Sequence, residues 1–249
     1  MENKKFIAFF DYLGFSDFIE KNSLKEQAKI LGQTFVMLER SISHGKVKDA
    51  PWGVVADMDD SNINVLNFSD TIVLWTNDDA VESLQELLRV VSEFNNYCNL
   101  YIFPIRGAIV YGEIIHLDHR RKTSNGGSYN INSVFGKGIV EAYKKSESQD
   151  WAGGVIDKSV IDYLEAKGVD PRIIFDDFAI KYKIPYKHQQ EETEEYALRL
   201  VKGALNKEAF KNASKHIETV FAAHNKDISD ERVQNKIQNT IKFLEVVVK

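Results

Sequence analysis

The feature that most constrains the fold is the apolar run Phe-Ile-Ala-Phe-Phe at residues 6–10, which ends at Asp11. A short run that is apolar at every position is typical of a strand buried on both faces, although its length alone does not exclude a helix. Gly14 follows and permits a tight turn and a close approach of the backbone to a ligand. The pattern predicts either a carboxylate at a strand end beside a metal and a phosphate, or an Asp11 that only caps a helix over residues 15–21.

A second carboxylate favours the metal site. Residues 63–68 and 72–75 have the composition of strands, and only residues 69–71 separate them, which predicts a hairpin with Asp70 at its tip. If this hairpin lies beside the first strand, Asp70 comes close to Asp11, and two adjacent carboxylates repel unless a cation or a proton lies between them. The pair therefore predicts a Mg²⁺ or Mn²⁺ site at which a substrate phosphate completes the coordination.

Four stretches, in order along the chain, resemble motifs of the class III nucleotide cyclases. Residues 11–16 resemble the Asp-x-x-Gly-Phe-[Ser/Thr] motif, and residues 68–70 resemble the second metal-aspartate hairpin. Residues 106–112 are similar to the Arg-x-Gly-Ile-x-x-Gly strand, and residues 136–144 resemble the Gly-x-x-Val-Asn-x-Ala-x-Arg helix. The likeness is closest to the short bacterial anti-phage pyrimidine cyclases, which make cyclic UMP or cyclic CMP.

The resemblance implies a two-metal site and a phosphate-binding turn. The ligands of two Mg²⁺ or Mn²⁺ ions would be Asp11, Asp70 and the backbone carbonyl of Tyr12. The backbone amides that would hold the β- and γ-phosphates of a ribonucleoside triphosphate belong to Leu13, Gly14 and Phe15. Many sites of this family are built across a homodimer, so the resemblance also implies a symmetric dimer with two equivalent sites.

Two cationic side chains are the other catalytic candidates. Lys144 matches the transition-state arginine of the family, and Arg106 would meet a phosphate or a base carbonyl, because arginine donates forked hydrogen bonds. Val140 stands where many relatives have a ribose-positioning asparagine, and lysine does not replace arginine at a bidentate contact. These departures keep open a degenerate domain that binds a nucleotide or a regulatory partner without turnover. A different metal-dependent nucleotidyl transferase on a ferredoxin-like palm is a further alternative, since a fold does not fix a function.

The base is predicted from what the site lacks. In adenylate cyclases, a lysine four residues before the second aspartate and an acid before the Gly-x-x-Val helix read the adenine; here the matching residues are Leu66 and Ser133. Arg106 and Ser133 would donate to uracil carbonyls, whereas cytosine presents an amino group that an arginine opposes. The resemblance thus implies conversion of UTP, in preference to CTP, to a 3′,5′-cyclic nucleotide and pyrophosphate in anti-phage defence. A purine substrate stays the alternative.

The order strand, helix, hairpin, helix, strand favours an α+β fold. The resemblance implies a ferredoxin-like antiparallel sheet with helices on one face, a catalytic domain over residues 1–186, and a helical extension over residues 187–249 that packs on the core or on a dimer partner. The extension is predicted to open as a helix at Glu191, Glu192, Glu194 and Glu195. Ser229 is a good N-cap for its last helix.

Three further segments are predicted from composition. Residues 46–61 and 118–133 are polar and predict exposed loops, and the second, which is basic, would contact a triphosphate, contact a partner subunit or only be solvated. The strand-like runs at residues 173–175 and 178–184 predict a small hairpin.

Composition excludes several classes of protein. The net charge of −5 argues against binding of a nucleic-acid polymer. Cys98 is the single cysteine, so no disulfide forms within the chain and a reducing cytoplasm is expected. No stretch approaches the roughly 20 apolar residues of a membrane span, and the N-terminus lacks the apolar segment of a signal peptide. The sequence therefore predicts a cytoplasmic protein with no membrane partner.

Overall fold

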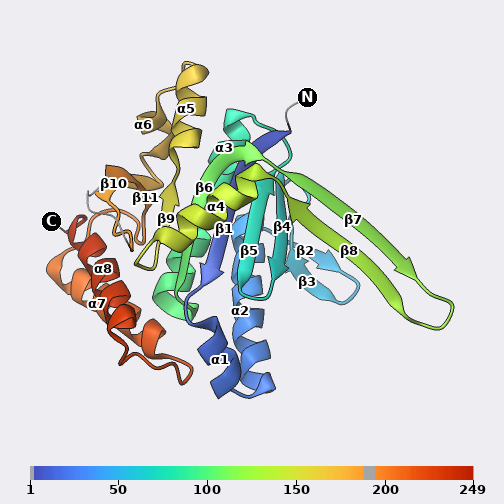
Figure 1. Ribbon diagram of the computed structural model, residues 1–249, viewed down its shortest axis with the longest axis horizontal. Coiled ribbons are helices and arrows are strands. Elements are labelled where there is room, and N and C mark those ends of the chain that lie inside the picture. The colour runs from blue at the N-terminus through green and yellow to red at the C-terminus, as the bar shows by residue number, and fades with distance from the viewer. Residues whose placement is uncertain (1–2, 188–193, 249) are drawn as a thin grey trace.

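The computed structural model describes residues 3–187 and 194–248 (Figure 1). Its centre is a seven-stranded sheet in the order β10-β11-β9-β6-β1-β5-β4. The strands of this sheet are β1 (Lys4–Tyr12), β4 (Ile63–Phe68), β5 (Thr71–Thr76), β6 (Ile105–Glu113), β9 (Gly154–Ile156), β10 (Ala179–Lys183) and β11 (Glu194–Leu198). The apolar run that opens the chain therefore forms an interior strand, β1, which pairs antiparallel with both β5 and β6.

The α+β class is confirmed, but the sheet is mixed rather than wholly antiparallel. β6 and β9 are parallel, while the other pairs of this sheet are antiparallel. Between β6 and β9 the chain first forms a hairpin that leaves the sheet and then helix α4 (Lys137–Ser148). A connection that crosses the sheet through a helix returns the next strand in the same direction, which explains the parallel pair.

Helices cover both faces of the sheet, whereas the sequence predicts helices on one face. Alternate residues of β1 point to opposite faces, so Phe6 and Phe10 share a core with α2 (Leu24–Ser43) and α3 (Val81–Tyr97), which continues into the π-helical turn η1 (Cys98–Ile102). On the other face, Ile7 and Phe9 pack in a cluster with Ala142 of α4.

Two glycines allow α4 to lie this close to the sheet. A Cβ atom on Gly112 of β6 would lie 2.7 Å from the Cα atom of Gly138 in α4. A side chain at either position would push the helix away, and α4 carries Lys144 and the other residues of the fourth cyclase-like stretch.

Two segments predicted as loops are hairpins. β2 (Val47–Ala50) pairs with β3 (Gly53–Ala56), and β7 (Ile115–Lys122) pairs with β8 (Ser128–Phe135). The β7–β8 hairpin projects away from the sheet (Figure 1), and every residue of β7 is exposed. Because these strands pair with each other and bury little of their surface, they lack the buried apolar residues that mark the strands of the main sheet.

The region between β9 and α7 also differs from the prediction. After α5 (Lys158–Ala166), the run at residues 173–175 belongs to helix α6 (Pro171–Phe175), because the Asp170 side chain caps the Arg172 amide and proline is suited to the first helical position. Residues 194–198, predicted as helix, form strand β11 between β9 and β10, so the sheet extends beyond residue 187. Glu191 and Glu192 lie outside the described residues.

Two C-terminal helices complete the fold, as predicted. α7 (Lys207–Ala222) and α8 (Glu231–Glu245) pack in a cluster that includes Leu13 at the end of β1 and Trp151. The side chain that caps α8 is that of Asp230, which accepts from the amide of Arg232, and not that of Ser229, which donates to Asp227 instead. Within residues 3–187 and 194–248, no helix has the length and apolar character needed to cross a membrane.

Candidate active site

The structure brings Asp11 and Asp70 to neighbouring strand ends. Asp11 lies opposite Thr71 of β5, and the Tyr12 amide donates to the Asp70 carbonyl at 3.0 Å. The turn between β4 and β5 contains Ser69 in the left-handed conformation, with φ of 54°. The predicted hairpin with Asp70 at its tip is therefore confirmed, and it lies directly beside β1.

The environment of Asp11 disfavours its charged form. Burial raises the pKa of this carboxyl to about 6, and the negative charges of Asp70 and Glu147 act in the same direction, while Arg106 opposes them. The side chain of Asp11 is 21% exposed, so water screens these charges only in part. A cation between Asp11 and Asp70 would relieve both the desolvation and the repulsion.

The two aspartates fit a hard cation with few protein ligands. Carboxylate oxygens suit Mg²⁺ or Mn²⁺, and Arg106 occupies only the Oδ2 atom of Asp11. No cluster of three or more histidine, cysteine, aspartate or glutamate side chains suited to a metal occurs in the described part of the chain. A metal here would thus take further ligands from the Tyr12 carbonyl, water or a substrate phosphate.

Arg106 lies beneath this site and is held by groups of the chain itself. Its side chain is 7% exposed, and its Nη2 atom donates to Oδ2 of Asp11 at 3.1 Å and also to the carboxylate of Glu147. Its Nη1 atom donates to the carbonyls of Glu147 and Gln149, at 3.3 Å and 3.4 Å. The guanidinium thereby ties the end of β1 to the last turn of α4.

Glu147 is a site residue that the sequence analysis does not identify. It shares Arg106 with Asp11, and it also pairs with Lys187 at 2.8 Å. The available signal was indirect: an arginine on a buried strand needs carboxylates around it, and Glu147 lies in the last turn of α4, the next helix along the chain after that strand.

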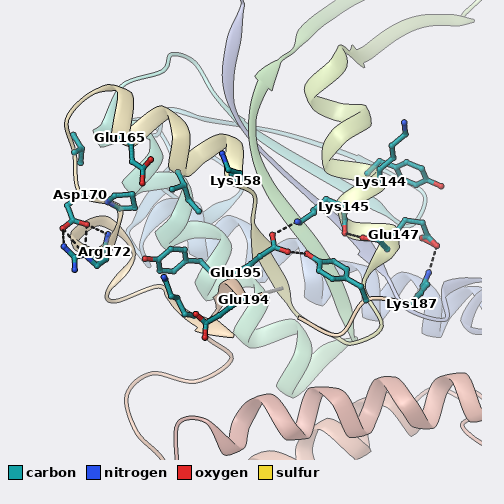
Figure 2. Close-up of a pocket in the computed structure, with 18 of the residues that line it drawn as sticks. Lys144, Lys145, Glu147, Lys158, Glu165, Asp170, Arg172, Lys187, Glu194 and Glu195 are labelled. Atoms are coloured by element: carbon teal, nitrogen blue, oxygen red, sulfur yellow. Dashed lines mark hydrogen bonds and ion pairs between the residues drawn. The ribbon is translucent and has the colours of Figure 1, made fainter. Parts of the chain in front are cut away.

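Lys144 lies on an exposed part of α4, apart from the charges that act on Asp11. It lines a cavity of about 1460 Å³ bounded by α4, α5, α6, β10 and β11, which Asp11 and Asp70 do not line. Figure 2 shows ion pairs at this cavity, among them Lys145 with Glu195 and Lys187 with Glu147.

The remaining predicted residues lie in two places. Ser133 is exposed on β8, opposite Leu117 of β7, in the projecting hairpin. Gly14 adopts a left-handed conformation with φ of 78° and immediately precedes α1 (Phe15–Lys21). The Leu13 amide donates to the Pro104 carbonyl at 2.8 Å, so this amide already has a partner within the chain.

No family model and no curated protein matches the sequence. Among solved structures, the chain is similar to the guanylate cyclase domain of RhGC from Catenaria anguillulae in complex with GTP, with a TM-score of 0.50, 9% identity, and coverage of 80% of this chain and 97% of that one. It also matches the dimeric guanylyl cyclase domain of the RhoGC fusion protein from Blastocladiella emersonii, with a TM-score of 0.47, 10% identity, and coverage of 79% and 94%. The chain therefore has the fold of class III nucleotide cyclase domains, extended by C-terminal helices.

Proposed function

We propose that this protein is a metal-dependent nucleotide cyclase that acts on a pyrimidine ribonucleoside triphosphate, UTP in preference to CTP. The observation that carries the proposal is the placement of Asp11 and Asp70 at neighbouring strand ends on a cyclase fold. Paired carboxylates in this position can bind cations, and the cations can in turn bind the phosphates of a nucleoside triphosphate.

The proposed reaction is an in-line displacement. The ribose 3′-hydroxyl gives its proton to water and its oxygen attacks the α-phosphorus, the bond from that phosphorus to the bridging oxygen breaks, and pyrophosphate leaves with the electron pair. Asp11 and Asp70 would hold Mg²⁺ or Mn²⁺, whose positive charge would lower the pKa of the hydroxyl and neutralise the leaving oxygens.

Each remaining residue has a proposed role. Arg106 orients the Asp11 carboxylate through its 3.1 Å hydrogen bond, and its role in base recognition stays a prediction. The amides at Gly14 and Phe15 meet the β- and γ-phosphates, and Ser133 stays the predicted donor to the base. Lys144, which is exposed, would stabilise the transition state in the site of a second subunit of a homodimer.

The surface around Lys144 supports the dimer proposal. Val140 and Tyr143, on the same helix, are 50% and 51% exposed although both are largely apolar. Exposed apolar groups beside Lys144 would suit a surface that a second chain covers.

A purine substrate is the second candidate, because the similar domain from Catenaria anguillulae is a guanylate cyclase in complex with GTP. Leu66 and Ser133 oppose an adenine substrate on the family pattern, and the fold alone does not choose the base. By its resemblance to anti-phage cyclases, the product would serve as a second messenger in phage defence in the cytoplasm.

The test is incubation of the purified protein with each of the four ribonucleoside triphosphates and Mn²⁺, with products identified by mass spectrometry. We expect cyclic UMP as the main product and no product from Asp11→Asn or Asp70→Asn. A higher kcat/KM for ATP or GTP would overturn the pyrimidine assignment. Binding without any cyclic product would instead favour the degenerate domain.

A further inference from the structure

A second cavity of about 870 Å³ separates the turn after β1 from the C-terminal helices. Leu13, Gly14 and Asp17 line it on one side, and Lys226 and Lys236 are among the residues that line it on the other. The cavity thus begins two residues after Asp11, at the turn where the proposed function places the phosphates of the substrate.

Several lysine and arginine side chains line this cavity, and most of them form ion pairs with aspartate or glutamate. Lys21 pairs with Asp17 at 2.7 Å, Lys187 with Glu147 at 2.8 Å, Arg232 with Asp230 at 2.8 Å and Lys236 with Asp150 at 3.0 Å. Lys226 is the exception among the cavity cations, since no carboxylate of the described residues lies within ion-pair distance of its amine. Asp227, the other acid lining the cavity, accepts hydrogen bonds from Ser229.

Lys226 is held beside the turn by an aromatic ring and a backbone carbonyl. Its Nζ atom lies 3.9 Å from the centre of the Phe103 ring and donates to the Val220 carbonyl at 3.2 Å. A lysine ammonium has three donors, so this one hydrogen bond leaves capacity for an anion. Burial lowers the pKa of the amine to about 7, and a bound anion would favour its charged form.

Gly14 fits this arrangement. A Cβ atom at this position would lie 3.4 Å from Cδ of Lys226, and the left-handed φ of 78° would be strained for any other residue. The turn and the lysine therefore approach each other closely across the cavity.

We propose that Lys226, from the C-terminal segment, binds the terminal phosphates of a nucleoside triphosphate at the β1–α1 turn of the same chain. The inference rests on the proposed function for the identity of the nucleotide. The ligand chemistry itself is that of a polyphosphate, which offers several anionic oxygens to a lysine on which the Asp17 carboxylate acts only from beyond ion-pair distance.

The test uses inorganic tripolyphosphate as the probe and calorimetry on the full chain. Lys226→Met keeps an unbranched side chain beside Phe103 and removes the charge, and we expect it to lower the affinity for tripolyphosphate by about tenfold or more. Lys226→Arg should stay within about threefold of the original protein, as should the matched control Lys242→Met, which alters an exposed lysine of α8 outside the cavity. Equal binding by Lys226→Met and the original protein, or no binding by either, overturns the proposal.

A second measurement follows the Lys226 side chain in the original protein, so it does not depend on whether Lys226→Met folds. In protein labelled at the lysine side chains, the Lys226 signal, assigned with Lys226→Arg, should move when tripolyphosphate saturates the protein, and an unmoved signal overturns the proposal. Asp11→Asn should abolish turnover yet retain Lys226-dependent binding. If the original protein shows this binding but converts none of the four ribonucleoside triphosphates, the cyclase function is refuted and this inference stands.

Discussion

Replacing Asp11 by asparagine should stabilise the metal-free protein at neutral pH. The pKa of Asp11 rises from 3.8 to about 6, mainly through burial. A rise of roughly 2 units corresponds to about 3 kcal/mol, and this figure already includes the attraction by Arg106. Asparagine has no charge to desolvate, so the variant escapes this cost.

The sign of the pH dependence follows from proton binding. Between pH values of about 4 and 6, folded Asp11 binds a proton more tightly than unfolded Asp11, so the stability of the original protein falls as the pH rises through this window. Above it, the full cost of about 3 kcal/mol remains, which corresponds to roughly 6–12 °C in Tm for a chain of this size. The variant should lack this part of the pH dependence.

The assay is thermal unfolding in a metal chelator, followed by circular dichroism from about pH 4 to about pH 7. Asp60→Asn is the matched control, because its side chain is 93% exposed, and its profile should follow that of the original protein. A constant difference in Tm between Asp11→Asn and the original protein across this range would refute the electrostatic reasoning.

Three further predictions concern the same region. Saturating Mn²⁺ should raise the Tm of the original protein by several degrees and that of Asp70→Asn by much less, because a ligand at about 100 times its Kd stabilises by about 2.7 kcal/mol; equal shifts in differential scanning calorimetry would contradict the metal assignment. A mixture of Asp70→Ala and Lys144→Ala chains should recover part of the cyclase activity, and no recovery despite proven subunit exchange would count against shared sites. Glu147→Gln should lose about 1–2 kcal/mol of unfolding free energy in urea, since Arg106 loses a charged acceptor, whereas Glu218→Gln on exposed α7 should lose almost none.

The sequence predicted the pairing of the strand ends that carry Asp11 and Asp70, because its signals are local. An apolar run that ends in Asp11, and two strand-like runs separated by three residues around Asp70, specify their own geometry. The contact of Arg106 with Glu147 joins residues 41 positions apart and depends on how α4 crosses the sheet, which no local pattern records. The pairing of strand ends was therefore predictable, and the electrostatics around it were not.

Strands β7 and β11 were not predicted, for a different reason. β7 is exposed along its whole length, so it shows no buried face, and β11 begins with two glutamates that resemble the start of a helix. In β11 the pairing with β9 and the burial of Ala197 and Leu198 outweigh that local preference. Contacts with distant parts of the chain, rather than local sequence, determine the secondary structure of such segments.

The interior place of β1 has a consequence for synthesis. β1 is made well before its partners β5 and β6, which begin at Thr71 and Ile105, so this apolar strand leaves the ribosome before either neighbour exists to pair with it. Lys4 and Lys5 precede the run Phe6–Phe10 in the sequence, where charged residues discourage intermolecular strand pairing. Nascent chains should therefore depend on these two lysines, or on a chaperone, until the ribosome has released β6.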